Sequence, residues 1–194
     1  MAGLAVFGLA SIGAALATTT AVMIVALYCA YIFAVTLIRP NAAPALPAAL
    51  AMGEAKGATG AEVMLAYHLG VEVECKIAEA IHPNHYKLGF HSSGTVGTFG
   101  AAVAAAKLLG LDRARIAHTL AIAASSAAGI RVNFGSMTKP LHVGRAAQNG
   151  IVAAELAAQG FTGGDDALDG FRIGIVSIEL ISRGKKSSAQ RISH

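Results

Sequence analysis

The chain has 194 residues, of which 55% are hydrophobic and only 13% are charged, with a formal net charge of +4. A charged fraction about half the roughly 25% of an average soluble domain excludes an intrinsically disordered chain. Four basic residues lie within the last dozen positions, so the rest of the chain is close to neutral and carries no nucleic-acid footprint. This composition is typical of either a deeply buried helical interior or a membrane segment.

The N-terminal zone, residues 1–38, contains no charged side chain. Within it, residues 21–38 form an apolar run of 18 residues that is closed by Arg39 and Pro40. About 20 apolar residues span a membrane, so the run is a borderline transmembrane candidate. Two other interpretations stay open: helices buried in a protein core, or a segment foreign to the rest of the chain.

Residues 41–163 show apolar side chains at helical spacing, separated by regular turn signals. Pro44 and Pro47 suit the first turn of a helix that runs to about residue 56, with Gly57 as its stop. Thr59 and Glu62 have the spacing of a capping box, which predicts a second helix from there to about residue 80.

Three further helices follow the same logic. Ser93 or Thr95 is suited to cap a helix that runs to about residue 109, before Gly110. Asp112 is suited to cap the next helix, to about residue 128, and a loop over residues 130–142 leads to a last helix over about 144–159. No alternating strand pattern of any length occurs, so the predicted fold class is all-α.

The last zone, residues 171–194, is a short apolar run followed by a basic tail, which we predict to be disordered. The two cysteines, Cys29 and Cys75, fit no metal or redox spacing and are interpreted as buried thiols in a reducing compartment. We therefore predict a cytoplasmic protein, with a membrane-associated protein as the alternative.

The residues suited to chemistry lie in two polar segments of this apolar chain, residues 82–95 and 133–145. Together they supply His91, Lys139, His142 and Arg145, with almost no acidic residue nearby in sequence. If the segments meet, they form a cationic pocket for a small polycarboxylate, in which a histidine moves a proton and a lysine binds a carboxylate or stabilises an oxyanion. On spacing alone, structural roles for these residues remain the more common outcome.

Three motifs resemble the MmgE/PrpD family. They are the Gly-rich stretch over residues 89–112, the stretch Met-Thr-Lys-Pro-Leu-His over 137–142 with its continuation to Gly150, and the turn over 160–163. The resemblance covers about residues 40–170 and implies the large helical domain of a lyase that works without a cofactor or metal, usually as a homodimer.

The resemblance implies that His91 is an acid or base and that Lys139 binds a substrate carboxylate or stabilises charge. His142, Arg145, Ser93 and Thr95 are predicted to bind substrate, although His142 is also suited to orienting the loop alone. The expected reaction is loss of water or carbon dioxide from a small di- or tricarboxylate, such as 2-methylcitrate in propionate metabolism or cis-aconitate.

The chain also departs from the family pattern. Arg39 precedes Pro40 where the family has a histidine-proline step, the acidic pair before that step is missing, and the family's smaller lid domain is absent from the 194 residues. We therefore expect a truncated lyase, active or inactive, with termini that are not family sequence. Two alternatives remain: a membrane-anchored, non-catalytic helical protein, and a fragment that folds only against a full-length partner.

Overall fold

The computed structural model describes residues 43–172, and helices dominate this part of the chain. The described region contains no strand, only an isolated antiparallel bridge between Phe90 and Ile130. The all-α class predicted from the sequence is confirmed. The elements in chain order are α3 (Ala45–Lys56), α4 (Gly60–Ile81), α5 (Asn84–Lys87), α6 (Ser92–Leu108), α7 (Arg113–Ser126), the 3-10 turn η2 (Arg131–Asn133) and α8 (Thr138–Ala158).

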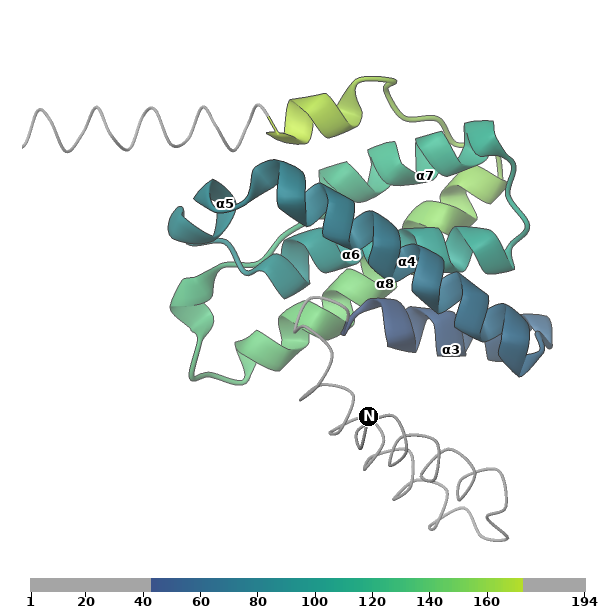
Figure 1. Cartoon of the computed structure of the whole chain (residues 1–194), viewed down its shortest axis with the longest axis horizontal. Coiled ribbons are helices and arrows are strands. Elements are labelled where there is room, and N and C mark those ends of the chain that lie inside the picture. The colour runs from purple at the N-terminus through teal and green to yellow at the C-terminus, as the bar shows by residue number, and fades with distance from the viewer. Residues whose placement is uncertain (1–42, 173–194) are drawn as a thin grey trace, which may run out of the picture. The chain divides into compact units, whose positions relative to one another are not determined.

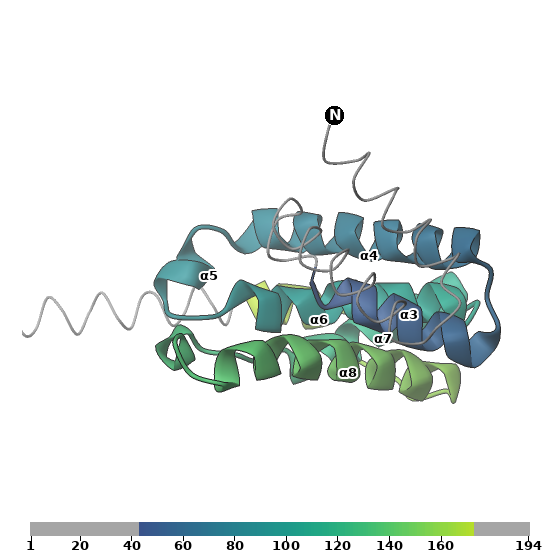
Figure 2. The ribbon, with the colours of Figure 1, turned by 90° about the horizontal axis from the view of Figure 1, so that it is seen from below.

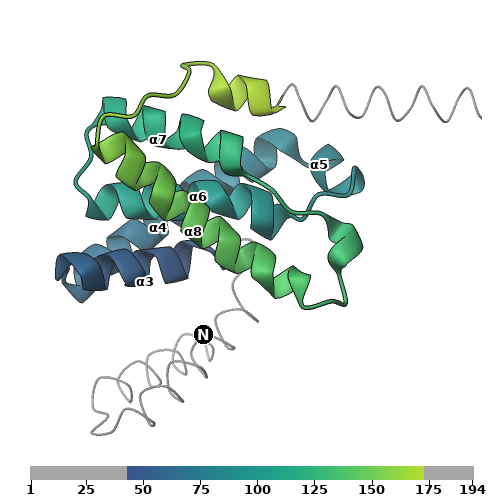
Figure 3. The same ribbon diagram turned by 180° about the vertical axis from the view of Figure 1, so that it is seen from behind.

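Helix α6 forms the centre of the described region. It contacts α3, α4, α7 and α8, and the views in Figures 1, 2 and 3 show these helices arranged around it. Every residue from Ser93 to Ala106 is buried. Because most of these residues are glycine or alanine, the surrounding helices approach the α6 backbone closely, and α6 has apolar surface on all its faces.

Two glycines on neighbouring helices show how close this packing is. A Cβ atom added to Gly70 of α4 would lie 2.5 Å from the carbonyl oxygen of Gly100, and one added to Gly150 of α8 would lie 2.5 Å from the amide nitrogen of Ala102. Both obstacles are backbone atoms, which cannot rotate away as a side chain can. Glycine is therefore required where α4 and α8 cross α6.

Most of the predicted helix boundaries are confirmed. Helix α3 stops at Gly57, whose φ of 63° is left-handed. Thr59 and Glu62 form the reciprocal bonds of a capping box before α4, and the side chain of Asp112 accepts from the Arg115 N–H before α7. The chain reverses direction after α6 at Gly110, which also has a left-handed φ, of 67°.

Two predicted helix starts are wrong. Neither Ser93 nor Thr95 caps α6; both lie inside the helix, whose N-cap position is occupied by His91 without a side-chain hydrogen bond. The last helix begins at Thr138 and not near residue 144, because Pro140 sits in the first turn, where its missing N–H would have had no partner. Lys139 and His142 are therefore helical residues and do not lie in a loop.

A buried carboxyl group interrupts the apolar contact between α4 and α6. Glu74 is 1% exposed, and a Cβ atom on Gly100 would collide with its Oε2 atom. Neither carboxyl oxygen has a hydrogen-bond partner, and burial raises the pKa of Glu74 to about 9. The group is therefore neutral at physiological pH.

No helix within residues 43–172 is long and apolar enough to cross a membrane. The apolar run over residues 21–38 and the basic tail lie outside the described residues.

Candidate functional site

The two polar segments meet at the N-terminal end of α6. The His91 N–H donates to the carbonyl oxygen of Gly129 at 3.0 Å, and the Arg131 N–H donates to that of Gly89 at 2.7 Å. These two bonds flank the bridge between Phe90 and Ile130. The backbone before α6 is thereby tied to the turn that leads into η2 and α8, which brings side chains about 50 positions apart into one cluster.

The centre of this cluster is a pair of imidazole rings. Nδ1 of His91 lies 3.0 Å from Nδ1 of His142, so the two rings share a hydrogen bond. His91 is 6% exposed and His142 is half-buried. The His142 ring lies against Gly129, where a Cβ atom would come within 3.4 Å of its Cγ and Nδ1 atoms. The small residue at position 129 therefore leaves the space that the ring occupies.

Phe134 connects this pair to the lysine. Its ring meets the His91 ring edge-on, with centroids 4.8 Å apart, and the Lys139 Nζ atom lies 4.7 Å from the centroid of the same ring. An ammonium group over an aromatic face is stabilised electrostatically. His91 and Lys139 are thus held on one aromatic side chain that comes from the loop between η2 and α8.

The surroundings keep His91 neutral. Burial lowers its pKa most, and the nearby His142 and Lys139 lower the pKa further because they oppose a positive charge on the ring. A neutral imidazole has one nitrogen with a lone pair and one with a proton. His91 is therefore suited to accept a proton at neutral pH.

Behind His91 lies a second, fully buried histidine. The hydroxyl of Thr95 donates to the His91 carbonyl oxygen at 3.2 Å and lies 2.8 Å from Nε2 of His85. Because a hydroxyl has only one proton, it either donates to His91 and accepts from Nε2–H of His85, or donates to an unprotonated Nε2, and the His85 tautomer decides between the two. Burial, with a smaller effect of His82, lowers the pKa of His85 to about 4, so this ring is also neutral.

The structure places the other predicted residues less centrally. Ser93 and Thr95 are both buried within α6, and Thr95 is engaged by His85. Arg145 is exposed and donates to the Gln148 side chain at 2.7 Å, one turn further along α8. The cluster therefore brings together His91, His142 and Lys139, while Arg145 bonds to Gln148 and Thr95 to His85.

Sequence reasoning missed three residues of this site. His85 and Phe134 lie in the two polar segments, but nothing in their spacing predicts that Phe134 contacts His91 or that His85 is linked to it through Thr95. Arg131 stacks its guanidinium 3.9 Å from the centroid of the Tyr86 ring and donates to the Tyr86 carbonyl oxygen at 2.9 Å. This contact ties η2 to α5 and so supports the loop that carries Phe134.

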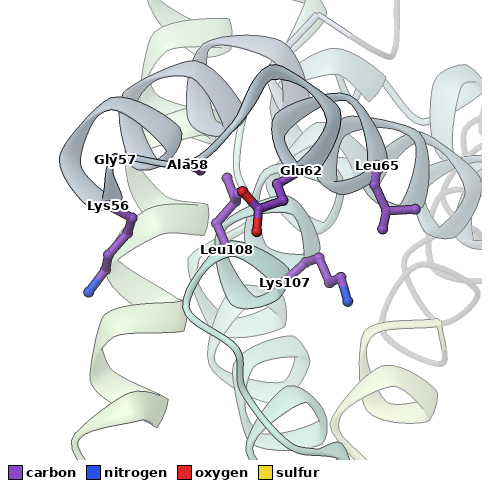
Figure 4. A pocket seen from close by; sticks show the side chains of 7 residues that line it. All are labelled: Lys56, Gly57, Ala58, Glu62, Leu65, Lys107 and Leu108. Atoms are coloured by element: carbon purple, nitrogen blue, oxygen red, sulfur yellow. The ribbon is translucent and has the colours of Figure 1, made fainter.

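A cavity of about 330 Å³ lies elsewhere, at the C-terminal end of α6. Figure 4 shows that the Lys56 and Lys107 side chains extend away from each other at its mouth, with Glu62 between them. All three are exposed, and the Glu62 carboxylate accepts from the Thr59 N–H at 2.7 Å. Among residues 43–172, no group of three metal-ligating side chains is present here or elsewhere.

These features define an all-α domain with a cluster of ionisable side chains: a neutral, buried histidine next to a second histidine and a lysine. Such a site is suited to proton transfer beside a bound anion.

The comparisons with known proteins agree with this class. The profile of the MmgE/PrpD N-terminal domain matches residues 7–186, so the chain belongs to the MmgE/PrpD family. The match is longer at both ends than the segment of residues 39–170 assigned to the family from the sequence.

The chain is also similar to cis-aconitate decarboxylases. It is 41% identical over 112 residues to the enzyme of Homo sapiens and 33% identical over 128 residues to that of Aspergillus terreus. These alignments cover 57% and 62% of this chain, but only 23% and 26% of the relatives. The chain is a dehydratase- or decarboxylase-like family member that spans about a quarter of the length of these relatives.

Proposed function

We propose that this chain carries the proton-transfer side of a lyase active site that acts on a small di- or tricarboxylate, with cis-aconitate as the first substrate to test. One observation carries the proposal. His91 and Lys139, 48 positions apart, share one aromatic ring at the N-terminal end of α6. The similarity to proteins named cis-aconitate decarboxylase supports the substrate class.

In the proposed reaction, Lys139 binds a carboxylate of the substrate. Its ammonium group is exposed and takes part in neither of the ion pairs described within residues 43–172, so its charge is available to an anion. The neutral His91 ring exchanges a proton with the carbon next to that carboxylate, and Lys139 stabilises the negative charge that develops on the oxygen atoms. Loss of carbon dioxide or of water completes the two alternative reactions.

The N-terminal end of α8 contributes to anion binding in this proposal. Lys139 lies in the first turn of a helix of 21 residues, where the helix dipole creates a positive potential. The helix end and the ammonium group therefore attract a carboxylate to the same place. A homodimer, as in the family, is part of the proposal and is testable by light scattering coupled to size-exclusion chromatography.

The testing experiment measures binding before turnover. Cis-aconitate and 2-methylcitrate are titrated into the purified 194-residue chain by calorimetry, and products are then identified by mass spectrometry. We expect binding that weakens at least about tenfold in Lys139→Ala, while Lys107→Ala at the other end of α6 binds as the parent does. A folded parent chain that binds neither acid, or a Lys139→Ala variant with undiminished binding, would exclude the proposed role of this site.

A further inference from the structure

We propose that His142 is a positioning residue that accepts a hydrogen bond from Nδ1–H of His91 and thereby leaves Nε2 of His91 with the lone pair that takes the substrate proton. This inference rests on the proposed function and states how the protonation of the base, His91, is set. It differs from the prediction that His142 binds substrate, because here His142 contacts His91 and not the substrate.

The geometry of the ring pair supports this assignment. The 3.0 Å contact joins the two Nδ1 atoms, so both Nε2 atoms lie outside the shared hydrogen bond. Two neutral imidazoles form such a bond only when one ring is protonated at Nδ1 and the other at Nε2. The pair therefore has two arrangements, and in each of them the protonation of one ring fixes that of the other.

Burial separates the two arrangements. His91 is 6% exposed, whereas His142 is half-buried in the second turn of α8. If His91 donates from Nδ1, then His142 carries its proton on Nε2, where water can accept the hydrogen bond. In the opposite arrangement, His91 carries its proton on Nε2, and this N–H belongs to the more buried ring. An unsatisfied buried N–H costs free energy, so the first arrangement is favoured in the absence of substrate.

Residues from several elements pack against the pair and hold the two rings in place. Gly94 of α6 and Gly129 lie against His142, since added Cβ atoms would come within 3.2 Å of its Cβ and 3.4 Å of its ring atoms. Phe134 packs against the His91 ring from the η2–α8 loop. The charged and titratable groups that act on the His91 ring are His142 and Lys139. His85 does not touch this ring, because it bonds to Thr95, whose hydroxyl contacts the carbonyl oxygen of His91.

The proton balance of the step is simple. The substrate C–H bond breaks, its proton goes to Nε2 of His91, and its electron pair stays on the substrate. The ring is then an imidazolium whose Nδ1–H still bonds to His142, and this proton can transfer to Nδ1 of His142 along a hydrogen bond whose two nitrogen atoms are 3.0 Å apart. The positive charge is in that case shared between the two rings, and no other reactant is required.

The test is a measurement of imidazole ¹⁵N chemical shifts in the full chain without substrate, at a pH above the titration of both rings. We expect a protonated Nδ1 and an unprotonated Nε2 on His91, with the reverse on His142. In His142→Phe, which keeps a ring but removes both nitrogens, we expect His91 to lose its Nδ1–H preference. In His142→Asn, whose Oδ1 atom can stand where Nδ1 stood, we expect the preference to return.

His68→Phe is the matched control, because His68 is exposed on α4 and the same substitution there should leave the His91 shifts unchanged. An Nε2–H on His91 in the parent chain, or His91 shifts that do not change in His142→Phe, would overturn the inference. Circular dichroism confirms that each variant is folded, and if His142→Phe does not fold, the parent spectrum and His142→Asn decide.

This readout is independent of the proposed function, because no substrate is present. Where turnover is measurable, His142→Phe should lower kcat at least about tenfold with little change in KM, because His142 acts on the base and not on substrate binding. A rise in KM with constant kcat would instead assign His142 to substrate binding. Failure of binding in Lys139→Ala tests only the proposed function and leaves the tautomer result standing.

Discussion

The two ends of helix α6 both carry ionisable side chains, but these side chains differ in their burial and in how far away in the sequence their partners lie. At the N-terminal end, His91 meets His142 from a helix that begins 47 positions later, and both rings are at least half-buried. At the C-terminal end, Lys107 lines a cavity with Lys56 and Glu62, all exposed, and the Glu62 carboxylate bonds to Thr59 only three positions away.

This difference shows why the cavity at the C-terminal end of α6 is not the best candidate for chemistry. The hydrogen bonds from Thr59 lower the pKa of Glu62, which keeps it ionised and occupied as a helix cap. At the other end, burial lowers the pKa of His91, with smaller effects of His142 and Lys139, and keeps the ring neutral, which suits it to proton transfer. Convergence of distant side chains with a perturbed pKa marks the N-terminal end of α6 as the candidate site, and the volume of a cavity alone does not.

The largest expected effect separates the two ends by activity. His91→Ala should reduce turnover of the substrate about 10²- to 10⁴-fold, the usual contribution of a general acid or base. Lys56→Ala and Lys107→Ala should change turnover less than about twofold, since no described contact joins them to the histidines. Steady-state kinetics measures both, and a comparable loss from Lys107→Ala would remove the distinction between the ends.

A second prediction uses the buried His85, which lies behind His91 in the candidate site. Its pKa is about 4 in the folded chain and about 6.5 in an unfolded one. The folded state therefore opposes protonation, and this group's contribution to the free energy of unfolding is complete above pH 6.5 and is lost as the pH falls toward 4. The loss is at most about 3 kcal/mol.

Urea denaturation at several pH values between 4 and 7 measures this slope. His85→Gln, which cannot titrate, should flatten the slope, while His68→Gln on the exposed face of α4 should leave it unchanged. A slope that stays the same in His85→Gln would assign the acid sensitivity to other groups, such as His91.

A third prediction concerns the close packing around the ring pair. A Cβ atom on Gly94 would lie 2.6 Å from the carbonyl oxygen of Ala128 and 3.2 Å from Cβ of His142. Gly94→Ala should therefore lower the free energy of unfolding by about 1–3 kcal/mol and displace His142 from His91. A Cβ atom added to Gly144 of α8 would meet no atom of another element within 4 Å. Gly144→Ala should therefore stabilise the chain by up to about 1 kcal/mol. Thermal unfolding compares the stability of the two variants. If both change stability equally, Gly94 is not in the close contact with Ala128 and His142 described above.

The smallest expected effect tests the C-terminal end. Thr59→Ala removes the capping box of α4 and should cost about 1 kcal/mol of stability. Because this end has no described contact with the histidines, the ¹⁵N shifts of His91 should not change. A shift in His91 would show that the two ends are coupled through α6.

Local sequence signals predicted the fold well because they act over a few residues. The capping box at Thr59 and the left-handed glycines Gly57 and Gly110 each need only their immediate neighbours to form, and all three predictions are confirmed. The start of α6 was predicted wrongly because Thr95 does not cap a helix end. Its hydroxyl bonds backwards to the His91 carbonyl, a contact available to a threonine inside a helix.

The site was only partly predictable for a different reason. His91 and Lys139 were selected through the family resemblance, and their roles remain predictions. The contact between Nδ1 atoms and the shared ring of Phe134 depend on the path of the chain between α7 and α8, which includes the bridge at Ile130. No pattern in the sequence specifies that path, because its hydrogen bonds join Gly89 and His91 to residues about 40 positions away.

The central position of α6 also sets the timescale on which each half of the site opens. Amide protons of a helix enclosed by four others exchange with solvent only when most of the structure unfolds, so the backbone of α6 that follows His91 should be among the slowest to exchange. The first turn of α8 and the η2 loop are exposed and should exchange through local opening. The backbone that carries His91 should therefore open only with the whole fold. The segment that carries Phe134 and Lys139 should open and reclose locally while the rest of the domain stays folded.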